Sequence, residues 1–242
     1  MGVNIHQGTL GTIPYLAYEG PQAKRLIFLQ HGIYGNKEKV MNLMGVAIAN
    51  LGYVVVGLDT VGHGERGEAP FLNGHSPHGE LRMFDLIEPT AEDVLAIYES
   101  VYQTRFSEFD YIGISLGGLI GYHLASQTKR LNRLYILMST PNYEAFYQHL
   151  NPTLSARYQT LIEAGKAKVK KLNPSLKPDA LAMKSLHVYH GLNDQEIPLS
   201  ATTEWLETAS LKDVTVETFE TGHKINKPMF EALLKRLKIT EG

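Results

Sequence analysis

The stretch FDYIGISLGGLIGYHLAS, residues 109–126, decides the fold class of this chain. Its first part, 109–114, is mostly aromatic and β-branched, which predicts a buried strand. Its second part, 116–126, is largely apolar and contains no proline, which predicts a helix. Ser115 lies between the two, in the pattern G-x-S-x-G. A serine on so short a strand-to-helix turn projects from the carboxyl edge of a sheet, so it is a candidate nucleophile.

Two glycines flank this serine, at positions 113 and 117. Because they lack Cβ atoms, the strand and the helix can approach each other closely around a tight, strained turn. The amino end of the helix also directs free N–H groups toward any negative charge that forms beside the serine. These features favour a nucleophilic Ser115 over the alternative, a glycine-rich turn with an incidental serine.

Strand and helix patterns alternate along the rest of the chain. Short apolar runs predict strands, and apolar residues at helical spacing predict helices. The predicted strands cover 26–30, 53–58, 109–114, 134–138, 186–189 and 214–219, and the predicted helices cover 37–51, 116–126, 199–209 and 227–237. Residues 9–18 predict one or two antiparallel edge strands. This alternation implies an α/β fold with a mostly parallel, twisted sheet and helices on both faces.

Another helix is predicted to begin near Thr90, after a polar, glycine-rich loop over 60–80. The sequence from Thr90 to Asp93 resembles a capping box with Asp in place of Glu. Apolar residues then recur on one helical face from Val94 to Tyr102.

Almost fifty residues separate the predicted strands at 134–138 and 186–189, which is long for a connection. Two helical patterns lie in this interval, at 143–150 and 153–172. We expect one domain over 1–242, with a small helical cap inserted at about 142–183. The alternative is a pair of ordinary surface helices. Three aromatic residues there could form either an apolar lid or the cap's own core: Tyr143, Phe146 and Tyr147.

Three further motifs follow predicted strands. They are HG-x-x-G-x-K-E from His31 to Glu38, D-x-x-G-H-G from Asp59 to Gly64, and the sequence from His190 to Pro198 that precedes Thr221-Gly222-His223. Together with the serine turn, they make nearly the whole chain resemble the α/β-hydrolase superfamily. The first motif is most similar to small esterases related to dienelactone hydrolases and to prolyl-oligopeptidase-like domains. The resemblance implies the three-layer α/β-hydrolase fold.

The resemblance also implies a Ser-His-Asp triad in the chain order Ser115, Asp194, His223. Asp194 comes shortly after a buried strand, which places its carboxylate at the same sheet edge as the serine. There it would accept the ring N–H of His223, fix the tautomer and stabilise the imidazolium. Glu196 and Glu144 are weaker candidates for this role, because neither matches the family position.

His223 lies between the last predicted strand and the final helix, on a loop that begins with Gly222. Such a loop can bring the imidazole back to the serine hydroxyl, whose proton it would accept. Among ten histidines, this position selects His223 as the base. His187 and His190 lie on a predicted strand, where a structural role is favoured.

The oxyanion hole requires two backbone N–H groups. One is that of Leu116, directly after the nucleophile, and family position assigns the other to Ile33. The chain lacks the HGGG run of many lipases. Tyr34 is a candidate substrate-binding residue, either as part of the pocket wall or, less favoured, through its hydroxyl.

Metal and cofactor sites are not expected. His63, His75 and His78 cluster in the glycine-rich loop, but they show no regular ligand spacing. With no cysteine, the chain has no disulfides, zinc–thiolate sites or cysteine nucleophiles. The proposed chemistry needs no cofactor.

The composition narrows the range of partners. A formal net charge of −2 gives no broad attraction to nucleic acid or anionic lipid. No apolar run reaches the roughly 20 residues of a membrane helix, and no signal-peptide pattern precedes residue 14. We therefore expect a cytoplasmic protein that binds a small ester, neither nucleic acid nor a membrane, in an oligomeric state that the sequence leaves open.

The sequence thus predicts a serine carboxylesterase for small esters, with short acyl chains favoured. Three alternatives within the hydrolases use the same triad: a thioesterase, a small peptidase and a carbon–carbon bond hydrolase. A cofactor-free perhydrolase and a binding protein that has lost catalysis remain as readings of other classes.

Overall fold

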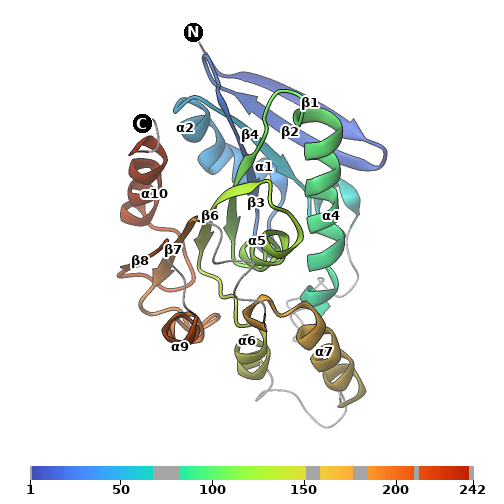
Figure 1. Cartoon of the computed structure of the whole chain (residues 1–242), viewed down its shortest axis with the longest axis vertical. Helices are drawn as coiled ribbons and strands as arrows, with labels where there is room; N and C mark the ends of the chain where they lie inside the picture. Colours follow the sequence, from blue (N-terminus) through green and yellow to red (C-terminus); the bar gives the residue numbers. More distant parts are fainter. Residues whose placement is uncertain (1, 68–81, 151–158, 177–184, 210–212, 240–242) are drawn as a thin grey trace.

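The computed structural model describes residues 2–67, 82–150, 159–176, 185–209 and 213–239 (Figure 1). Its strands form one sheet of eight in the order β1-β2-β4-β3-β5-β6-β7-β8. Their bounds are β1 Asn4–Leu10, β2 Ile13–Glu19, β3 Arg25–Gln30, β4 Tyr53–Leu58, β5 Phe109–Ile114, β6 Leu131–Leu137, β7 Ser185–Gly191 and β8 Val214–Phe219. The pairs β1–β2 and β2–β4 are antiparallel, and all the others are parallel.

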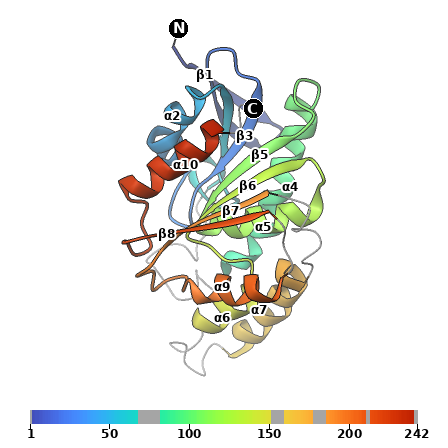
Figure 2. The same ribbon diagram turned by 60° about the vertical axis from the view of Figure 1, so that its left-hand side comes forward.

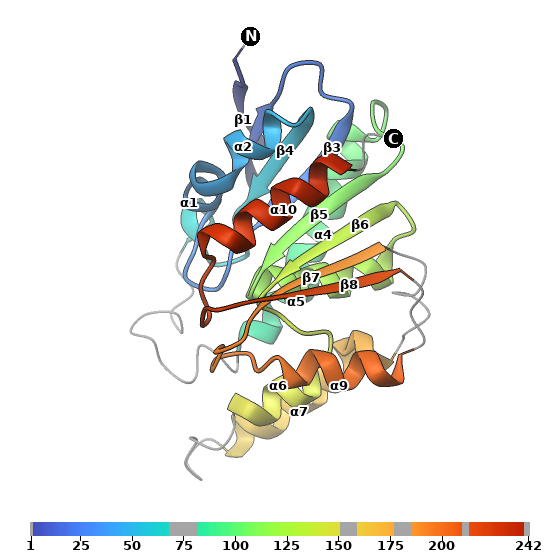
Figure 3. The ribbon, with the colours of Figure 1, turned by 90° about the vertical axis from the view of Figure 1, so that its left-hand side faces the viewer.

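Helices cover both faces of the sheet. One face carries α1 Lys37–Val40, a π-helical turn Met41–Gly45, α2 Val46–Ala49 and α10 Lys227–Ile239, and the other carries α4 Ile87–Ile97 and α5 Leu116–Gln127. Figure 3 shows α2 and α10 in front of the strands, with α4 and α5 behind them. The expected three-layer α/β-hydrolase fold is confirmed.

The apolar run of β3 explains why both faces need helices. Leu26 and Phe28 are buried against the α4–α5 side, whereas Ile27 and Leu29 are buried against the α2–α10 side. Successive side chains of a strand point to opposite faces, so a continuous apolar run requires cover on both.

The sequence prediction for the start of α4 is wrong. The helix begins at Ile87, one turn before the expected cap. Thr90 is fully buried, and its Oγ1 accepts a hydrogen bond from the Val61 N–H at 3.3 Å. Asp93 forms an ion pair with Arg66. Both side chains of the predicted capping box therefore bond to residues outside α4.

Other boundaries differ less. The antiparallel edge is a complete hairpin over 4–19, longer than the expected 9–18. The predicted helix at 37–51 ends at Ala49 and contains the π-helical turn. The expected helix at 153–172 is described from Gln159 onward, and its first six residues lie outside the described ranges.

The interval between β6 and β7 contains α6 Tyr143–Leu150, α7 Gln159–Leu172 and a 3₁₀ turn, η8 Pro174–Leu176. Figure 2 shows α6 and α7 beyond the ends of the strands, beside α9 Ser200–Thr208. Tyr143, Phe146 and Tyr147 are all buried and pack around the ring of Phe84. These aromatic residues therefore form a core between α6 and the 3₁₀ turn η4, Met83–Asp85.

No helix among the described residues has both the length and the apolar character needed to cross a lipid bilayer.

Candidate active site

Ser115 occupies a strained turn between β5 and α5. Its φ of 54° and ψ of −114° lie outside the regions that L-residues ordinarily adopt. Its N–H donates to Leu137 O at 2.9 Å, and its carbonyl accepts from the N–H groups of Gly118 and Leu119 at 2.8 and 3.1 Å. These bonds hold the turn in place, so the hydroxyl projects at the carboxyl edge of the sheet.

The flanking glycines are required by close backbone contacts. A Cβ on Gly113 would lie 2.3 Å from the Gly117 carbonyl oxygen. A Cβ on Gly117 would lie 2.5 Å from the Gln30 carbonyl oxygen. Because neither position has room for a side chain, the G-x-S-x-G pattern is what allows β3, β5 and α5 to meet here.

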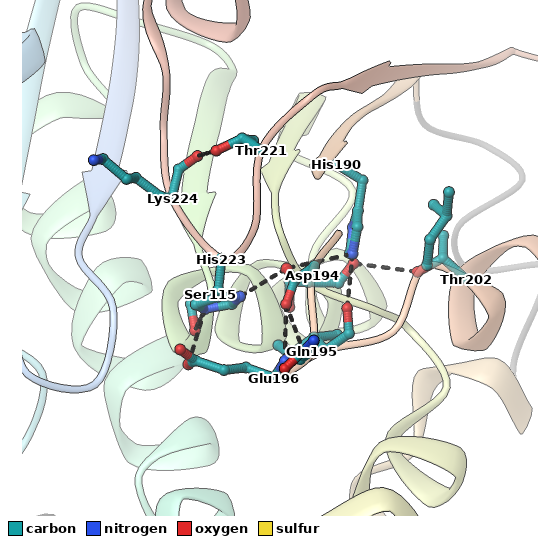
Figure 4. A network of polar contacts seen from close by, with 12 residues as sticks. Ser115, His190, Asp194, Gln195, Glu196, Thr202, Thr221, His223 and Lys224 are labelled. Carbon is teal, nitrogen blue, oxygen red and sulfur yellow. Dashed lines mark hydrogen bonds and ion pairs between the residues drawn. The ribbon is translucent and has the colours of Figure 1, made fainter. Parts of the chain in front are cut away.

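Three side chains from distant parts of the sequence meet at this turn (Figure 4). His223 Nε2 lies 2.9 Å from Ser115 Oγ, and His223 Nδ1 lies 2.8 Å from Asp194 Oδ2. Asp194 follows β7, and His223 lies on the loop between β8 and α10. The structure thus brings together the three residues that the sequence predicted to meet.

The two loops that carry the aspartate and the histidine lie against each other. The Asn193 N–H donates to Thr221 O at 3.0 Å, and the Leu192 N–H donates to Phe219 O at 2.9 Å. A Cβ on Gly191 would lie 2.4 Å from the Gly222 carbonyl oxygen, so a glycine is needed for this approach. These backbone contacts fix Asp194 relative to His223.

Asp194 is held in its charged form. Burial opposes ionisation, but hydrogen bonds from His223 and the Ile197 N–H outweigh it and keep the pKa of this carboxyl below its ordinary value. Oδ1 accepts the N–H groups of Glu196 and Ile197, both at 3.0 Å. An ionised Asp194 requires a proton on His223 Nδ1, which leaves the Nε2 lone pair free to accept the serine proton.

His190 forms a hydrogen bond to the same loop. It is fully buried, and burial lowers its pKa. Its Nε2 donates to Ile197 O at 2.8 Å, which anchors the turn around Asp194. His187 points elsewhere and bonds to Ser185 Oγ and Thr215 Oγ1, at 3.0 and 2.7 Å.

The alternative acids occupy other positions. Glu196 Oε2 lies 3.7 Å from His223 Nε2, the nitrogen that faces the serine, so it is not the acceptor for Nδ1. Glu144, on α6, lines a separate cavity with Tyr147 and Glu163.

The loop after β3 presents the predicted second oxyanion donor beside the serine. A Cβ on Gly32 would lie 3.4 Å from Ser115 Cβ. The Gly32 carbonyl accepts hydrogen bonds from His31 Nδ1 at 2.7 Å and from the Gly35 N–H at 2.9 Å. In a trans peptide the N–H of the next residue points opposite to that carbonyl, so these two bonds set the direction of the Ile33 N–H.

His31 is itself held in one tautomer. Its Nε2 accepts the Thr60 N–H at 3.1 Å, which leaves Nδ1 to carry the proton donated to Gly32. Burial lowers the pKa of His31 to about 4, so the ring is neutral at physiological pH. His63 packs against this ring and bonds to the Ile33 carbonyl. His75 and His78 lie outside the described residues.

Leu116 supplies the other predicted donor. As the first residue of α5, its N–H has no partner within the helix. It directly follows Ser115, and Ile33 lines both cavities that include Ser115, so the two predicted donors come to the serine from α5 and from the β3 loop.

Two cavities adjoin Ser115. The first, of about 230 Å³, lies toward α6 and has the apolar wall residues Ile33, Met83, Phe146, Leu150 and Ile197. The second, of about 470 Å³, lies on the His223 side, and its wall includes Leu43, Met138 and Ile225. Tyr34 and Glu196 line both cavities. Tyr34 is therefore part of the wall, as the sequence favoured.

Sequence reasoning missed several residues of these walls. Met83, His149 and Gln195 line the first cavity, although they come from three separate segments. Phe146 combines both roles that the sequence left open, since it belongs to the aromatic core and also faces this cavity. The sequence predicted that Phe146 belongs to an aromatic cluster, but it did not predict how close this residue lies to Ser115.

One acidic group in the described residues has carboxylates close enough for a metal ion: Glu38, Asp59 and Glu65. The ammonium of Lys37 lies among them, at 2.7, 2.8 and 2.5 Å respectively. Burial opposes the charge of Lys37, but these bonds outweigh it and raise its pKa. A lysine thus supplies the positive charge, and it ties the HG-x-x-G-x-K-E motif to the D-x-x-G-H-G motif.

Comparisons with known proteins agree with this architecture. Residues 25–200 match the family model of the alpha/beta hydrolase fold. The chain is 23% identical over 221 residues to "Putative esterase YitV" of Bacillus subtilis (strain 168), covering 85% of this chain and 84% of that protein.

Solved structures show the same fold. TT1662 from Thermus thermophilus superposes with a TM-score of 0.79 at 22% identity, covering 99% of this chain and 98% of the other. The acylaminoacyl peptidase of Pyrococcus horikoshii superposes with a TM-score of 0.70 at 16% identity, covering 99% of this chain but 40% of that longer one. The family match spans most of the sequence, and the strand order and serine turn accord with it: the chain belongs to the α/β-hydrolase fold family.

Proposed function

We propose that this protein is a serine esterase that cleaves small carboxylic esters. The observation that carries the proposal is the continuous chain of hydrogen bonds from Ser115 Oγ through His223 to Asp194, at 2.9 and 2.8 Å. Such a chain lets one imidazole first accept and later return a proton.

In the first half of the proposed reaction, His223 Nε2 takes the proton of Ser115 as Oγ attacks the ester carbonyl. The negative oxygen of the tetrahedral intermediate accepts hydrogen bonds from the Leu116 and Ile33 N–H groups. His223 then gives its proton to the departing alcohol, and the acyl group remains on Ser115.

In the second half, water takes the place of the alcohol. His223 accepts a proton from water as it attacks the acyl-enzyme, and the proton returns to Ser115 Oγ when the acid leaves. Asp194 stays ionised throughout and stabilises the imidazolium. Neither a metal nor a cofactor is needed for these steps.

The two cavities suggest how an ester would lie. The alcohol must leave close to His223 Nε2, so we assign it to the cavity that includes His223. The acyl chain then enters the cavity toward α6, which at about 230 Å³ is smaller than typical ligand pockets of 300–1,000 Å³. We propose that the insertion at about 142–183 acts as a cap that limits this acyl cavity.

The names of the compared proteins include both esterases and peptidases. YitV is named as an esterase, and a structural neighbour with a TM-score of 0.66 is a cold-adapted esterase from an Arctic intertidal metagenomic library. The acylaminoacyl peptidases match over about two fifths of their length. The full-length likeness to esterases supports ester hydrolysis, with amide and thioester cleavage as the alternatives to measure.

The test is an acyl-length series of nitrophenyl esters, from acetate to dodecanoate, with wild type and Ser115→Ala. We expect the highest kcat/KM for short chains and a fall of at least about 10⁴-fold in turnover in the variant. Peptidyl nitroanilides and acyl thioesters serve as matched substrates. Faster turnover of either class, or of long-chain esters, would contradict the proposal.

A further inference from the structure

Glu196 places an extra carboxylate at the reacting centre. Its Oε2 lies 3.7 Å from His223 Nε2, the same nitrogen that lies 2.9 Å from Ser115 Oγ (Figure 4). The proposed triad already has its acid in Asp194, on the opposite side of the ring. The Glu196 carboxylate therefore has no part in the reaction steps described above.

The backbone of Glu196 is fixed relative to the triad. Its N–H donates to Asp194 Oδ1 at 3.0 Å. On the neighbouring residue, the Gln195 carbonyl accepts a hydrogen bond from His149 Nε2 of α6 at 2.8 Å. The carboxylate thus projects from an anchored turn into the space between the two cavities, both of which it lines.

This position is on the alcohol side of a bound ester. His223 Nε2 must reach the leaving oxygen in order to protonate it, so that oxygen lies beside Nε2 during the reaction. A carboxylate 3.7 Å from Nε2 is therefore close to the first atoms of the alcohol. The oxyanion, by contrast, would lie toward the Leu116 and Ile33 N–H groups.

The described residues around the alcohol cavity leave this negative charge available to a ligand. Lys224 also lines that cavity, but Figure 4 shows its ammonium pointing away from Ser115 and His223. The side chain of Glu196 is 72% exposed, so a ligand can reach it. The nearby wall residues Leu43, Met138 and Ile225 are apolar and offer contact to alkyl groups.

We propose that Glu196 forms a cation subsite for the alcohol part of the substrate, so that the enzyme prefers esters of amino alcohols or quaternary ammonium alcohols. A two-carbon spacer between ester oxygen and ammonium keeps the charge within ion-pair reach of a carboxylate so placed. This inference rests on the proposed esterase function and adds the chemical class of the alcohol.

The exposure of the Glu196 carboxylate determines how much it can change kcat/KM for a cationic ester. Ion pairs in contact with solvent contribute little and are weakened by salt. We therefore expect the carboxylate to change kcat/KM for a cationic ester by about two- to fivefold, rather than by orders of magnitude.

The experiment compares butyrylcholine with 3,3-dimethylbutyl butyrate, in which a carbon replaces the quaternary nitrogen. The readout is the ratio of their kcat/KM values, measured for wild type, Glu196→Gln and Glu92→Gln. Glu92 is exposed on α4 and lines neither cavity, so it controls for the loss of one negative charge. Comparing ratios between variants cancels the different intrinsic reactivities of the two esters.

We expect the ratio to fall about two- to fivefold in Glu196→Gln and to stay at the wild-type value in Glu92→Gln. Raising the ionic strength should lower the wild-type ratio toward that of Glu196→Gln. An anionic analogue, 2-sulfoethyl butyrate, should respond in the opposite sense and gain from Glu196→Gln.

Equal ratios in wild type and Glu196→Gln, or an equal fall in Glu92→Gln, would overturn the cation subsite while leaving the esterase proposal intact, provided that the neutral ester is hydrolysed through Ser115. If wild type hydrolyses neither butyrate ester nor any nitrophenyl ester, the proposed function fails and the subsite fails with it.

Discussion

Asp194, in the loop after β7, and Asp110, in β5, are both buried carboxylates, but they differ in charge. Asp194 is 7% exposed and accepts hydrogen bonds from His223 and from two backbone N–H groups, and its pKa lies below its ordinary value. Asp110, on β5, is 3% exposed, and its pKa is raised to about 7 by burial. The guanidinium of Arg133 is 3.9 Å away, and Oδ1 has no hydrogen-bond partner among the described residues.

The comparison shows that hydrogen-bond donors, rather than burial, distinguish the candidate catalytic carboxylate. Burial disfavours the charge of both groups. At Asp194, but not at Asp110, enough hydrogen-bond donors point at the carboxylate to overcome that cost. The hydrogen bonds that the loop from Gly191 to Pro198 directs at Asp194 therefore keep this carboxylate ionised.

The largest expected effect is a difference in kcat between variants of the two aspartates. In Asp194→Asn the side chain at position 194 carries no negative charge, so it no longer stabilises the imidazolium of His223. The neutral amide also no longer fixes the tautomer and orientation of the ring. We expect kcat to fall about 10⁴-fold on a short-chain nitrophenyl ester. The matched variant Asp110→Asn should stay within about twofold of wild type. Steady-state kinetics on folded protein, checked by circular dichroism, measures both, and similar losses in the two variants would contradict the comparison.

The next largest effect concerns Asp110, whose titration should make the free energy of unfolding depend on pH. The pKa of Asp110 is about 7 in the folded protein and near 3.8 when unfolded, so between these values only the folded state keeps the proton. Stability must then fall as pH rises through this window, by up to about 4 kcal/mol once both states are ionised. Asp110→Asn has no such titration.

Urea unfolding of wild type and Asp110→Asn between pH 4 and pH 8 measures this difference. We expect the free energy of unfolding of the variant to increase relative to that of wild type as pH rises, with most of the change complete near pH 8. A constant difference across the range would show that Asp110 is ionised in the folded state throughout.

The smallest effect extends the comparison to two buried histidines. Burial lowers the pKa of His31 and of His187 to about 4, but only His31 bonds to the loop that presents the Ile33 N–H. His31→Ala should lower kcat about 10- to 100-fold with a smaller change in KM, because the oxyanion donor loses its fixed direction.

His187→Ala is the matched control, since it also removes a buried, hydrogen-bonded imidazole. We expect it to lower stability by about 1–3 kcal/mol while kcat stays within about twofold. Equal losses of kcat in the two variants would assign the role of His31 to general stability rather than to positioning.

Much of the fold was predictable because local patterns and tertiary packing agree. The apolar run from Leu26 to Leu29 and the G-x-S-x-G turn have few alternatives, so strands, helices and the serine turn follow from sequence. The prediction failed at Thr90, where buried contacts to the Val61 N–H and Arg66 outcompete a local cap.

The candidate site divides in the same way. Ser115, Asp194 and His223 lie at most four residues beyond the ends of their strands, so the topology brings them to one edge. The cavity walls depend on how separate segments pack, as with Met83 of η4 and Phe146 of α6. The position of Glu196 beside His223 Nε2 follows from a backbone turn that residue types alone do not specify.

Ser115 is proposed as a nucleophile that His223 activates. The most direct test of this role is intact-protein mass spectrometry after treatment with a fluorophosphonate, followed by peptide mapping. We predict a single adduct on Ser115 of wild type, formed in step with loss of esterase activity, and none on Ser115→Ala. Labelling at another residue, or an equally labelled Ser115→Ala, would contradict the account.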